Sequence, residues 1–279
     1  MDIGCGTGIL SIFASRAGAK HVYGIEFADI ADYAREIVKV NKLTDKVTII
    51  KSKVEEAVLP VDKVDIIISE WMGYFLIYES MLDTVLYARD KWLKKDGYIL
   101  PDKASLTVAA MEDGNYKSSK LQFWDDVYGI NMKCVKPAVM SEPLIDICER
   151  QAINSSHCKI MEIDLYTVKK EDLDFTAAYE LTFFRSDTVH GIISWFDIYF
   201  DKLPNKVEFT TSPYSKATHW KQVVFYTDHD LYVEKGEVLK GSIAVKKSNF
   251  NFREIDVKLS LHFSGRNDKK DWYQLFKIR

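Results

Sequence analysis

The sequence predicts an α/β chain in which a doubly wound parallel sheet is followed by an antiparallel sheet or barrel. Up to Pro101, short β-branched runs alternate with longer segments of helical spacing, as in parallel strands joined by crossover helices. After Pro101 the runs are longer, alternating and aromatic-rich. Residues from about 115 to 148 fit strands poorly and look like a helical insertion. We therefore divide the chain into domains at 1–101 and 102–279, with an inserted arm at about 115–148.

Strands and helices alternate along the first domain. The predicted elements are a strand ending at 3, a helix at 9–17, a strand at 21–25, a helix at 29–41, strands at 47–50 and 64–69, and a helix from 79 to 96–97. Gly18 is well placed as a helix stop, as is Asp96-Gly97, and Asp29 can cap the second helix. The run Val64–Ser69 is too apolar for a half-exposed strand, so we expect it to be covered.

The second domain is dominated by strand patterns. They lie at 106–110, 160–168, 175–184, 191–200, 238–245 and 257–263. The arm carries a set of apolar side chains that suit either a local core or a partner surface about equally well. They are Leu121, Phe123, Trp124, Val127 and Tyr128.

Composition and charge exclude several classes of protein. The 38 basic and 41 acidic residues give a net charge of −3, which argues against a surface that tracks nucleic-acid phosphates. The sequence starts without a signal-peptide pattern, and no run approaches the roughly 18 apolar residues of a membrane span. The four cysteines lack metal-ligand spacing. We expect a soluble, unexported protein with reduced thiols and no metal, membrane or direct nucleic-acid partner.

A glycine-rich loop, Asp2–Gly8, joins the first strand to the first helix, where backbone must approach a ligand closely. Ile9 takes the place of the third glycine in the dinucleotide fingerprint, which counts against a nicotinamide or flavin cofactor. Glu26 closes the second strand, where an acidic side chain accepts hydrogen bonds from ribose hydroxyls. Each feature alone is explained by a tight turn or a solvated strand end. Together they predict a nucleoside site.

A second loop follows the fourth strand and is bracketed by Glu70 and Glu79. It lies at the carboxyl edge of the sheet, where such folds bind ligands. Either glutamate alone reads as an exposed carboxylate, and Glu79 as a helix cap. Between them stands an apolar and aromatic wall that would be costly to expose, which favours a joint role. Its members are Trp71, Met72, Tyr74, Phe75 and Tyr78.

If the nucleoside cofactor is a cationic methyl donor, two carboxylates beside it suit a guanidinium substrate, which stays positively charged at neutral pH. Two positive charges about 4 Å apart repel by roughly 4 kcal/mol at an effective dielectric near 20. Uncompensated, that repulsion would slow transfer about a thousandfold. A glutamate pair can hold the guanidinium in a planar fork and align one terminal nitrogen with the methyl group.

The sequence resembles the type I protein arginine methyltransferases, above all their principal, broad-specificity member. The resemblance is carried by Asp2–Gly8, Glu26, Ser69–Glu79 and Thr218-His219-Trp220. The similarity covers essentially the whole chain, although the last seven or so residues are less recognisable. The glutamate-bracketed loop and the Thr-His-Trp loop are more specific to the family than the glycine loop. The resemblance implies a Rossmann-like S-adenosylmethionine-dependent methyltransferase domain followed by a β-barrel domain with a dimerisation arm.

The resemblance also implies roles for single residues. Cofactor contacts fall on Asp2, Gly4, Gly6, Gly8, Glu26, Val54 and Glu55. Glu70 and Glu79 would grip the substrate guanidinium, with Met81 beside the reacting centre and Trp220 also in the substrate site. His219 would help to accept the proton released on methylation. Without the resemblance, His219 reads as a packed or surface histidine.

The implied cofactor is S-adenosyl-L-methionine, with S-adenosyl-L-homocysteine as product and no metal. The implied substrates are arginines of Gly/Arg-rich proteins and histone tails, with monomethyl and asymmetric dimethyl products. The resemblance further implies a head-to-tail homodimer formed through the arm, acting in cytoplasm and nucleus.

The family has a helical segment before the first strand, whereas this sequence begins inside that strand. We therefore expect a truncated sequence that binds cofactor weakly or turns over slowly, because its pocket lacks a lid. Two alternatives stay open. A small-molecule methyltransferase would share the glycine loop and Glu26, and a non-catalytic scaffold would dimerise through the arm.

Overall fold

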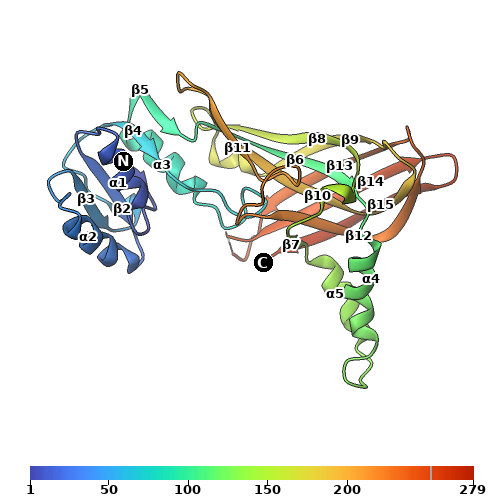
Figure 1. Cartoon of the computed structure of the whole chain (residues 1–279). Coiled ribbons are helices and arrows are strands. Elements are labelled where there is room, and N and C mark those ends of the chain that lie inside the picture. Colours follow the sequence, from blue (N-terminus) through green and yellow to red (C-terminus); the bar gives the residue numbers. More distant parts are fainter. Residues whose placement is uncertain (252) are drawn as a thin grey trace.

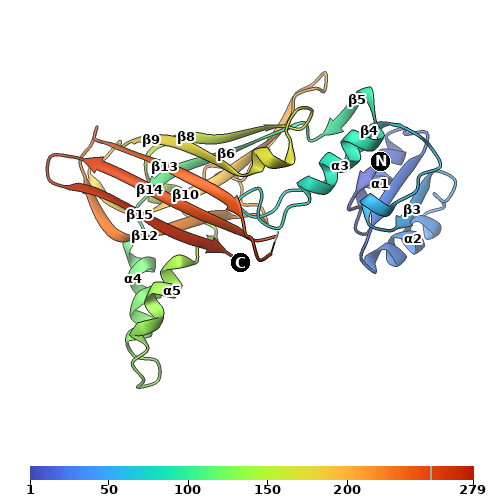
Figure 2. The ribbon, with the colours of Figure 1, turned by 180° about the vertical axis from the view of Figure 1, so that it is seen from behind.

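The computed structural model describes residues 1–251 and 253–279. An α/β module and a larger module of antiparallel strands follow each other along the chain, with a helical arm projecting from the second (Figure 1). Helix α3 lies between the two modules in both views (Figures 1 and 2). The fold class expected from the sequence is thereby confirmed. None of the helices described has the length and apolarity that crossing a membrane requires.

The first module is a parallel sheet with the strand order β3-β2-β1-β4-β5. Its strands are β1 (Asp2–Ile3), β2 (Val22–Glu26), β3 (Val47–Lys51), β4 (Val64–Ile68) and β5 (Leu93–Leu100). The chain runs outward from β1 to β3 and then returns to place β4 on the other side of β1. The order reverses between β1 and β4, and ligands of such sheets bind beside that point at the carboxyl ends of the strands.

Three α-helices accompany this sheet. They are α1 (Ile9–Arg16), α2 (Ile30–Val40) and α3 (Leu82–Trp92), with a 3₁₀ turn η1 (Val54–Glu56). Helix α1 ends as predicted, with Gly18 in the left-handed region at φ 102°. Asp29 occupies the predicted N-cap position of α2, but its side chain makes no capping hydrogen bond. Its carboxylate instead accepts a hydrogen bond from Lys51 Nζ at 2.8 Å.

The helix expected to run to Asp96-Gly97 ends at Trp92, and the residues after it form β5. Pairing with β4 decides this outcome, since Ile67 aligns with Ile99 in parallel register. Gly97 is needed for the close approach: a Cβ there would lie 2.9 Å from the Asp65 carbonyl oxygen. Sheet pairing therefore overrides the helical spacing of the apolar residues.

The expectation that β4 is fully covered was also wrong. Ile66 is 44% exposed and its register partner Tyr98 is 43% exposed. The described part of the chain therefore leaves one face of β4 and β5 partly open to solvent.

The second module contains two antiparallel sheets (Figure 1). One has the order β7-β12-β10-β6-β8, with β11 added to β10, and the other has the order β15-β14-β13-β9. The strands are β6 (Lys103–Met111), β7 (Leu144–Asp146), β8 (Ile153–Asp164), β9 (Phe175–Thr182), β10 (Asp187–Phe200), β11 (Val207–Thr210), β12 (Gln222–Val233), β13 (Val238–Lys247), β14 (Ile255–Ser264) and β15 (Lys269–Ile278). The 3₁₀ turns η4 (Arg150–Ala152) and η5 (Lys170–Leu173) flank β8.

One hydrophobic core continues from the parallel sheet into the antiparallel module. Most of the apolar wall of the glutamate-bracketed loop lies within it: Trp71 and Phe75 are almost fully buried, as is the neighbouring Leu76. The ring of Phe75 meets Phe225 of β12 edge-on, with centroids 5.3 Å apart. Burial of this loop ties it to both modules, so its position depends on both.

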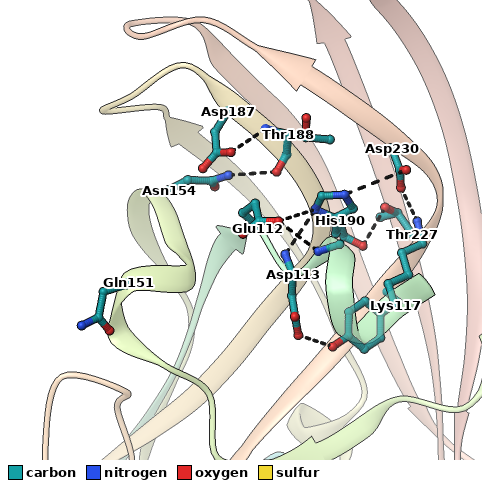
Figure 3. Close-up of polar contacts among 12 residues, drawn as sticks. Glu112, Asp113, Lys117, Gln151, Asn154, Asp187, Thr188, His190, Thr227 and Asp230 are labelled. Carbon is teal, nitrogen blue, oxygen red and sulfur yellow. Dashed lines mark hydrogen bonds and ion pairs between the residues drawn. The ribbon is translucent and has the colours of Figure 1, made fainter. Parts of the chain in front are cut away.

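The arm leaves the barrel between β6 and β7 and consists of α4 (Gly114–Gln122), η2 (Phe123–Asp125), η3 (Lys133–Val135) and α5 (Lys136–Ser141). A polar network anchors its first helix to the barrel (Figure 3). Lys117 Nζ lies 2.5 Å from Asp230 Oδ1, and Tyr226 donates a 2.6 Å hydrogen bond to Asp113. The Asp113 N–H donates to His190 Nδ1 at 3.2 Å. The root of the arm is thus fixed by charged and hydrogen-bonded groups.

Candidate functional site

The glycine-rich loop leaves the carboxyl end of β1 in a conformation that requires glycine. Gly4, Gly6 and Gly8 have φ values of 67°, 53° and 82°, which favour residues without a Cβ. The N–H groups of Gly4 and Cys5 donate to the Ile25 carbonyl oxygen at 2.9 and 3.1 Å. These bonds hold the loop against the end of β2.

Two carboxylates border this loop. Glu26 accepts hydrogen bonds from the N–H groups of Gly6 at 3.0 Å and Ala28 at 2.8 Å. Asp2 is buried, and one of its oxygens accepts a 2.7 Å bond from the Ser11 hydroxyl. Burial raises the pKa of the Asp2 carboxyl, and the bond from Ser11 opposes this shift. The other oxygen of Asp2 has no partner among the described residues.

This arrangement fits a nucleoside cofactor. Each carboxylate oxygen can accept more than one hydrogen bond, so Glu26 keeps acceptor capacity for hydroxyl groups after its two backbone bonds. The unpartnered buried oxygen of Asp2 is costly unless a bound group satisfies it. Asp2 and Glu26 can therefore hold the polar groups of a nucleoside.

The turn η1 lies beyond β3, whose following residue Ser52 donates its N–H to the Glu26 carbonyl oxygen at 3.0 Å. Val54 is buried and Glu55 is exposed. Tyr87 of α3 donates to the Glu55 carbonyl oxygen at 3.2 Å. Val54 and Glu55, two of the predicted cofactor contacts, thus follow a strand end that is hydrogen-bonded to Glu26.

The glutamate-bracketed loop folds back on itself between β4 and α3. The Ser69 hydroxyl donates to the Ile3 carbonyl oxygen at 2.8 Å, joining its start to the end of β1. The Met81 N–H donates to the Trp71 carbonyl oxygen at 2.9 Å, closing its base. Phe75, Leu76 and Glu79 have positive φ values of 51°, 65° and 55°. Such a conformation costs free energy in non-glycine residues and persists only where surrounding contacts hold it.

Both bracketing glutamates are exposed at this loop. Neighbouring protein atoms partly desolvate Glu70 and raise the pKa of its carboxyl. Glu70 has no hydrogen-bond or ion-pair partner in the described residues. Glu79 Oε1 lies 3.6 Å from a guanidinium nitrogen of Arg253, and the Glu79 N–H donates to the Arg253 carbonyl oxygen at 3.0 Å.

Met81 brings the two loops into contact. A Cβ added to Gly4 would lie only 2.3 Å from Met81 Cε, so the methionine packs directly on the glycine loop. The loop that ends in Glu79 and Met81 is therefore adjacent to the predicted cofactor site.

The Thr-His-Trp loop reaches the same region from the barrel. The Trp220 indole N–H donates to the Met72 carbonyl oxygen at 3.1 Å, and its ring stacks on Phe209. His219 is exposed, and its ring centroid lies 3.8 Å from that of Trp220. No hydrogen bond joins His219 to Glu70 or Glu79 among residues 1–251 and 253–279. The Trp220 bond links the two loops, and the role of His219 stays a prediction.

Some contacts at this site were missed from the sequence. Arg253 pairs with Glu79 across 174 positions of sequence, and Lys247 pairs with Asp83 of α3. No local spacing signals such pairs, and only the first-turn position of Asp83 in a helix could have drawn attention to it. Across the described residues, no three His, Cys, Asp or Glu side chains gather as metal ligands would.

Comparison with known proteins bears on the whole chain. Residues 102–266 match the family model of the arginine methyltransferase oligomerization subdomain, and residues 1–114 match that of ribosomal protein L11 methyltransferase. Protein arginine N-methyltransferase 1 of Chlamydomonas reinhardtii is 53% identical over all of this chain and 81% of its own length. Its namesake in Schizosaccharomyces pombe is 52% identical over 97% of this chain and 80% of its own length.

Solved structures agree. A Trypanosoma brucei PRMT1 enzyme-prozyme heterotetrameric complex with AdoHcy contains a chain 42% identical to this one. It aligns with a TM-score of 0.96 over 100% of this chain and 88% of its own. Arabidopsis thaliana protein arginine methyltransferase 10 is 29% identical, with a TM-score of 0.87 over the same shares. With these matches extending over both modules, the chain belongs to the protein arginine N-methyltransferase family and is an S-adenosylmethionine-dependent enzyme.

Proposed function

We propose that this enzyme methylates arginines in Gly/Arg-rich proteins and histone tails, giving monomethylarginine and asymmetric dimethylarginine. The observation that carries the proposal is the contact of Met81 with Gly4, which sets the end of the glutamate-bracketed loop against the glycine loop. Two exposed carboxylates at that loop offer acidic groups to a basic peptide.

Asp2, Gly4, Gly6, Gly8 and Glu26 form the cofactor site in this proposal, together with Val54 and Glu55 of η1. When bound, S-adenosylmethionine supplies an electrophilic methyl group on a cationic sulfonium. Glu26, held by two backbone N–H groups, accepts hydrogen bonds from the ribose hydroxyl groups. The buried oxygen of Asp2 accepts a further hydrogen bond.

Glu70 and Glu79 hold the substrate guanidinium and orient one terminal nitrogen toward the methyl group. Their negative charge offsets the repulsion between the guanidinium and the sulfonium, estimated above at roughly 4 kcal/mol. Glu79 already lies near the guanidinium of Arg253, so its carboxylate is accessible to a group of this kind. The substrate guanidinium takes the place of Arg253 during binding.

The nitrogen loses a proton as it gains the methyl group. His219, exposed beside Trp220, accepts that proton and passes it to solvent. Trp220 stacks on Phe209 and donates to Met72, which keeps the loop of His219 next to the substrate loop. Met81 borders the reacting centre.

The Glu79→Gln variant tests the central role. Loss of the charge that aligns the guanidinium should lower kcat on a Gly/Arg-rich peptide by roughly 10²-fold or more. The affinity for S-adenosylhomocysteine, measured by titration calorimetry, should stay within about twofold, because Glu79 lies outside the cofactor site. The exposed Glu36 of α2 gives the control variant Glu36→Gln, which should match the wild type.

Substrate panels decide between the proposal and its alternatives. Methylation of small amines in preference to Gly/Arg-rich and histone-tail peptides would establish a small-molecule enzyme. The two dimethylarginine isomers have the same mass, so chromatographic amino-acid analysis after acid hydrolysis reports which isomer forms, and a symmetric product would contradict the proposed product type.

We also propose a head-to-tail homodimer formed through the arm and action in both cytoplasm and nucleus, without direct nucleic-acid or membrane contacts. The match to an oligomerization subdomain supports the assembly. Fractionation of cells expressing the tagged chain tests the location.

A further inference from the structure

Helix α3 begins directly after Met81 and is attached to the barrel by an acidic side chain in its first turn. The Asp83 carboxylate accepts two hydrogen bonds from Lys247 Nζ, at 2.7 Å to one oxygen and 2.6 Å to the other. Lys170 Nζ lies 3.1 Å from the same carboxylate. We refer to Asp83, Lys170 and Lys247 as the α3 clamp.

Both lysines are held by the barrel module. Lys247 is the last residue of β13, and its backbone pairs with Ile255 of β14. Its N–H also donates to Asp174 Oδ1 at 2.9 Å. Lys170 begins η5, just before β9. The clamp therefore links the first turn of α3 to two separate barrel segments. Asp83 and Lys247 are 164 positions apart in the sequence.

The residues just before the clamp are those proposed to act on the substrate. Met81 occupies the N-cap position of α3 and packs on Gly4, and the Val85 N–H donates to the Met81 carbonyl oxygen at 3.1 Å. Glu79, two residues earlier, has a positive φ that surrounding contacts must maintain. A shift of the first turn of α3 would move Glu79 and Met81 together.

We propose that Asp83 is a positioning residue for methyl transfer, acting through Lys247 and Lys170 to fix Glu79 and Met81 between the glycine loop and the barrel. The proposal rests on the role assigned above to Glu79. It differs from a plain helix-dipole effect, in which an acidic residue in the first turn stabilises α3 regardless of the lysines. Under that reading, replacing Lys247 has no effect on catalysis.

The side chains of Asp83 and Lys247 are only 28% and 22% exposed, so solvent screens their ion pair less than it screens a surface pair. The chain offers a matched control on the same strand. Lys240 of β13 lies 3.0 Å from Glu180 of β9, with both side chains largely exposed and away from α3. This surface pair resembles the clamp in chemistry but has no link to the substrate loop.

The experiment compares Asp83→Asn, Lys247→Met and their double variant with Lys240→Met and Glu180→Gln. Since a misplacement of about 1 Å can cost up to 10²-fold, Asp83→Asn should lower kcat on a Gly/Arg-rich peptide about tenfold. Lys247→Met should have a smaller effect because Lys170 remains, and the double variant should equal Asp83→Asn. The KM for S-adenosylmethionine and the Tm should stay near wild type, as should every constant of the control pair.

Two further variants test whether charge reversal and its rescue change kcat, which a general loss of stability would not explain. Asp83→Lys should be the poorest enzyme, since it places a third cation beside Lys170 and Lys247. Combining it with Lys247→Asp should restore part of kcat. Unchanged kcat in Asp83→Asn, or equal losses of kcat, cofactor affinity and Tm, would overturn the positioning role. Glu79→Gln serves as a separate arm: if it stays active, the proposed function itself fails.

Discussion

The surroundings of Glu70 give the enzyme a defined pH response. Partial desolvation raises the pKa of this carboxyl, so a larger fraction is protonated at a given acidic pH than for a free glutamate. Only the ionised form can hold a guanidinium. A bound cation favours ionisation and lowers the same pKa in the complex.

We therefore expect the acid limb of kcat/KM to lie above the usual glutamate range, and the acid limb of kcat to lie at lower pH. Rates on an arginine peptide measured from about pH 5 to 9 will check this. The rates are measured in the His219→Gln variant as well, because it lacks the proposed proton acceptor and the acid limbs that remain in it report Glu70. Coincident limbs would show that Glu70 does not hold the substrate cation.

The residue types at the site could be predicted because each is attached to a local signal. The glycines follow a strand end, Glu26 ends the next strand, and Glu70 follows β4. The ion pairs could not be predicted, since Asp83–Lys247 and Glu79–Arg253 depend on how two modules meet. The spacing of residues within one segment carries no information about which residue of a distant segment will pair with it.

At the scale of single elements, α4 is held at its root by contacts of Asp113 and Lys117 (Figure 3). The Tyr226 hydroxyl of β12 donates a hydrogen bond to Asp113, the residue that precedes α4. Burial is the main cause that raises the pKa of Tyr226, and this bond to Asp113 adds to it. Tyr226→Phe removes the donor and leaves the Asp113 carboxylate short of a partner. We expect about 1–3 kcal/mol lower free energy of unfolding in urea denaturation.

Tyr232→Phe is the matched control for that measurement. Tyr232 lies on the same strand, is largely exposed, and has no hydroxyl hydrogen bond among the described residues. The control should stay within about 0.5 kcal/mol of wild type. Equal effects from both variants would mean that the Asp113 bond contributes little.

Elements with a clear internal period were predicted well, and those that depend on a neighbour were not. Helix α1 and strands β2 and β3 lie within one or two residues of the expected bounds. Strand β5 was assigned to a helix because its apolar spacing continues that of α3. Strands β12 and β15 were missed, although both alternate buried and exposed residues over part of their length.

At the scale of the whole molecule, the arm presents apolar side chains to solvent. Phe123 and Ile130 are more than half exposed, and Tyr128 is 99% exposed with a positive φ. A cluster of this kind is costly in an isolated chain and is typical of an interface. The surface suits the second copy of the proposed homodimer.

Tyr128→Ser should weaken that homodimer at least tenfold, since large aromatic anchors contribute much of the free energy of association at about 1.4 kcal/mol per tenfold. Sedimentation velocity over a range of concentrations measures the change. Tyr273→Ser, at an exposed aromatic of β15 that is outside the arm segment, should behave like wild type. Dissociation by Tyr273→Ser alone would place the interface on the barrel instead of the arm.

The hydrogen bond from Trp220 to Met72 has a consequence for biosynthesis. Its two partners are 148 positions apart, so the growing polypeptide exposes the glycine loop long before Trp220 leaves the ribosome. At roughly 5–20 residues per second, synthesis of those 148 residues takes about 7 to 30 seconds. During that time, strands β1 to β5 of the nascent chain can pair. The aromatic residues of the glutamate-bracketed loop stay uncovered until the barrel has been made. Newly made protein would therefore complete its cofactor site first and its substrate site last. Methylation would be delayed until translation is nearly finished.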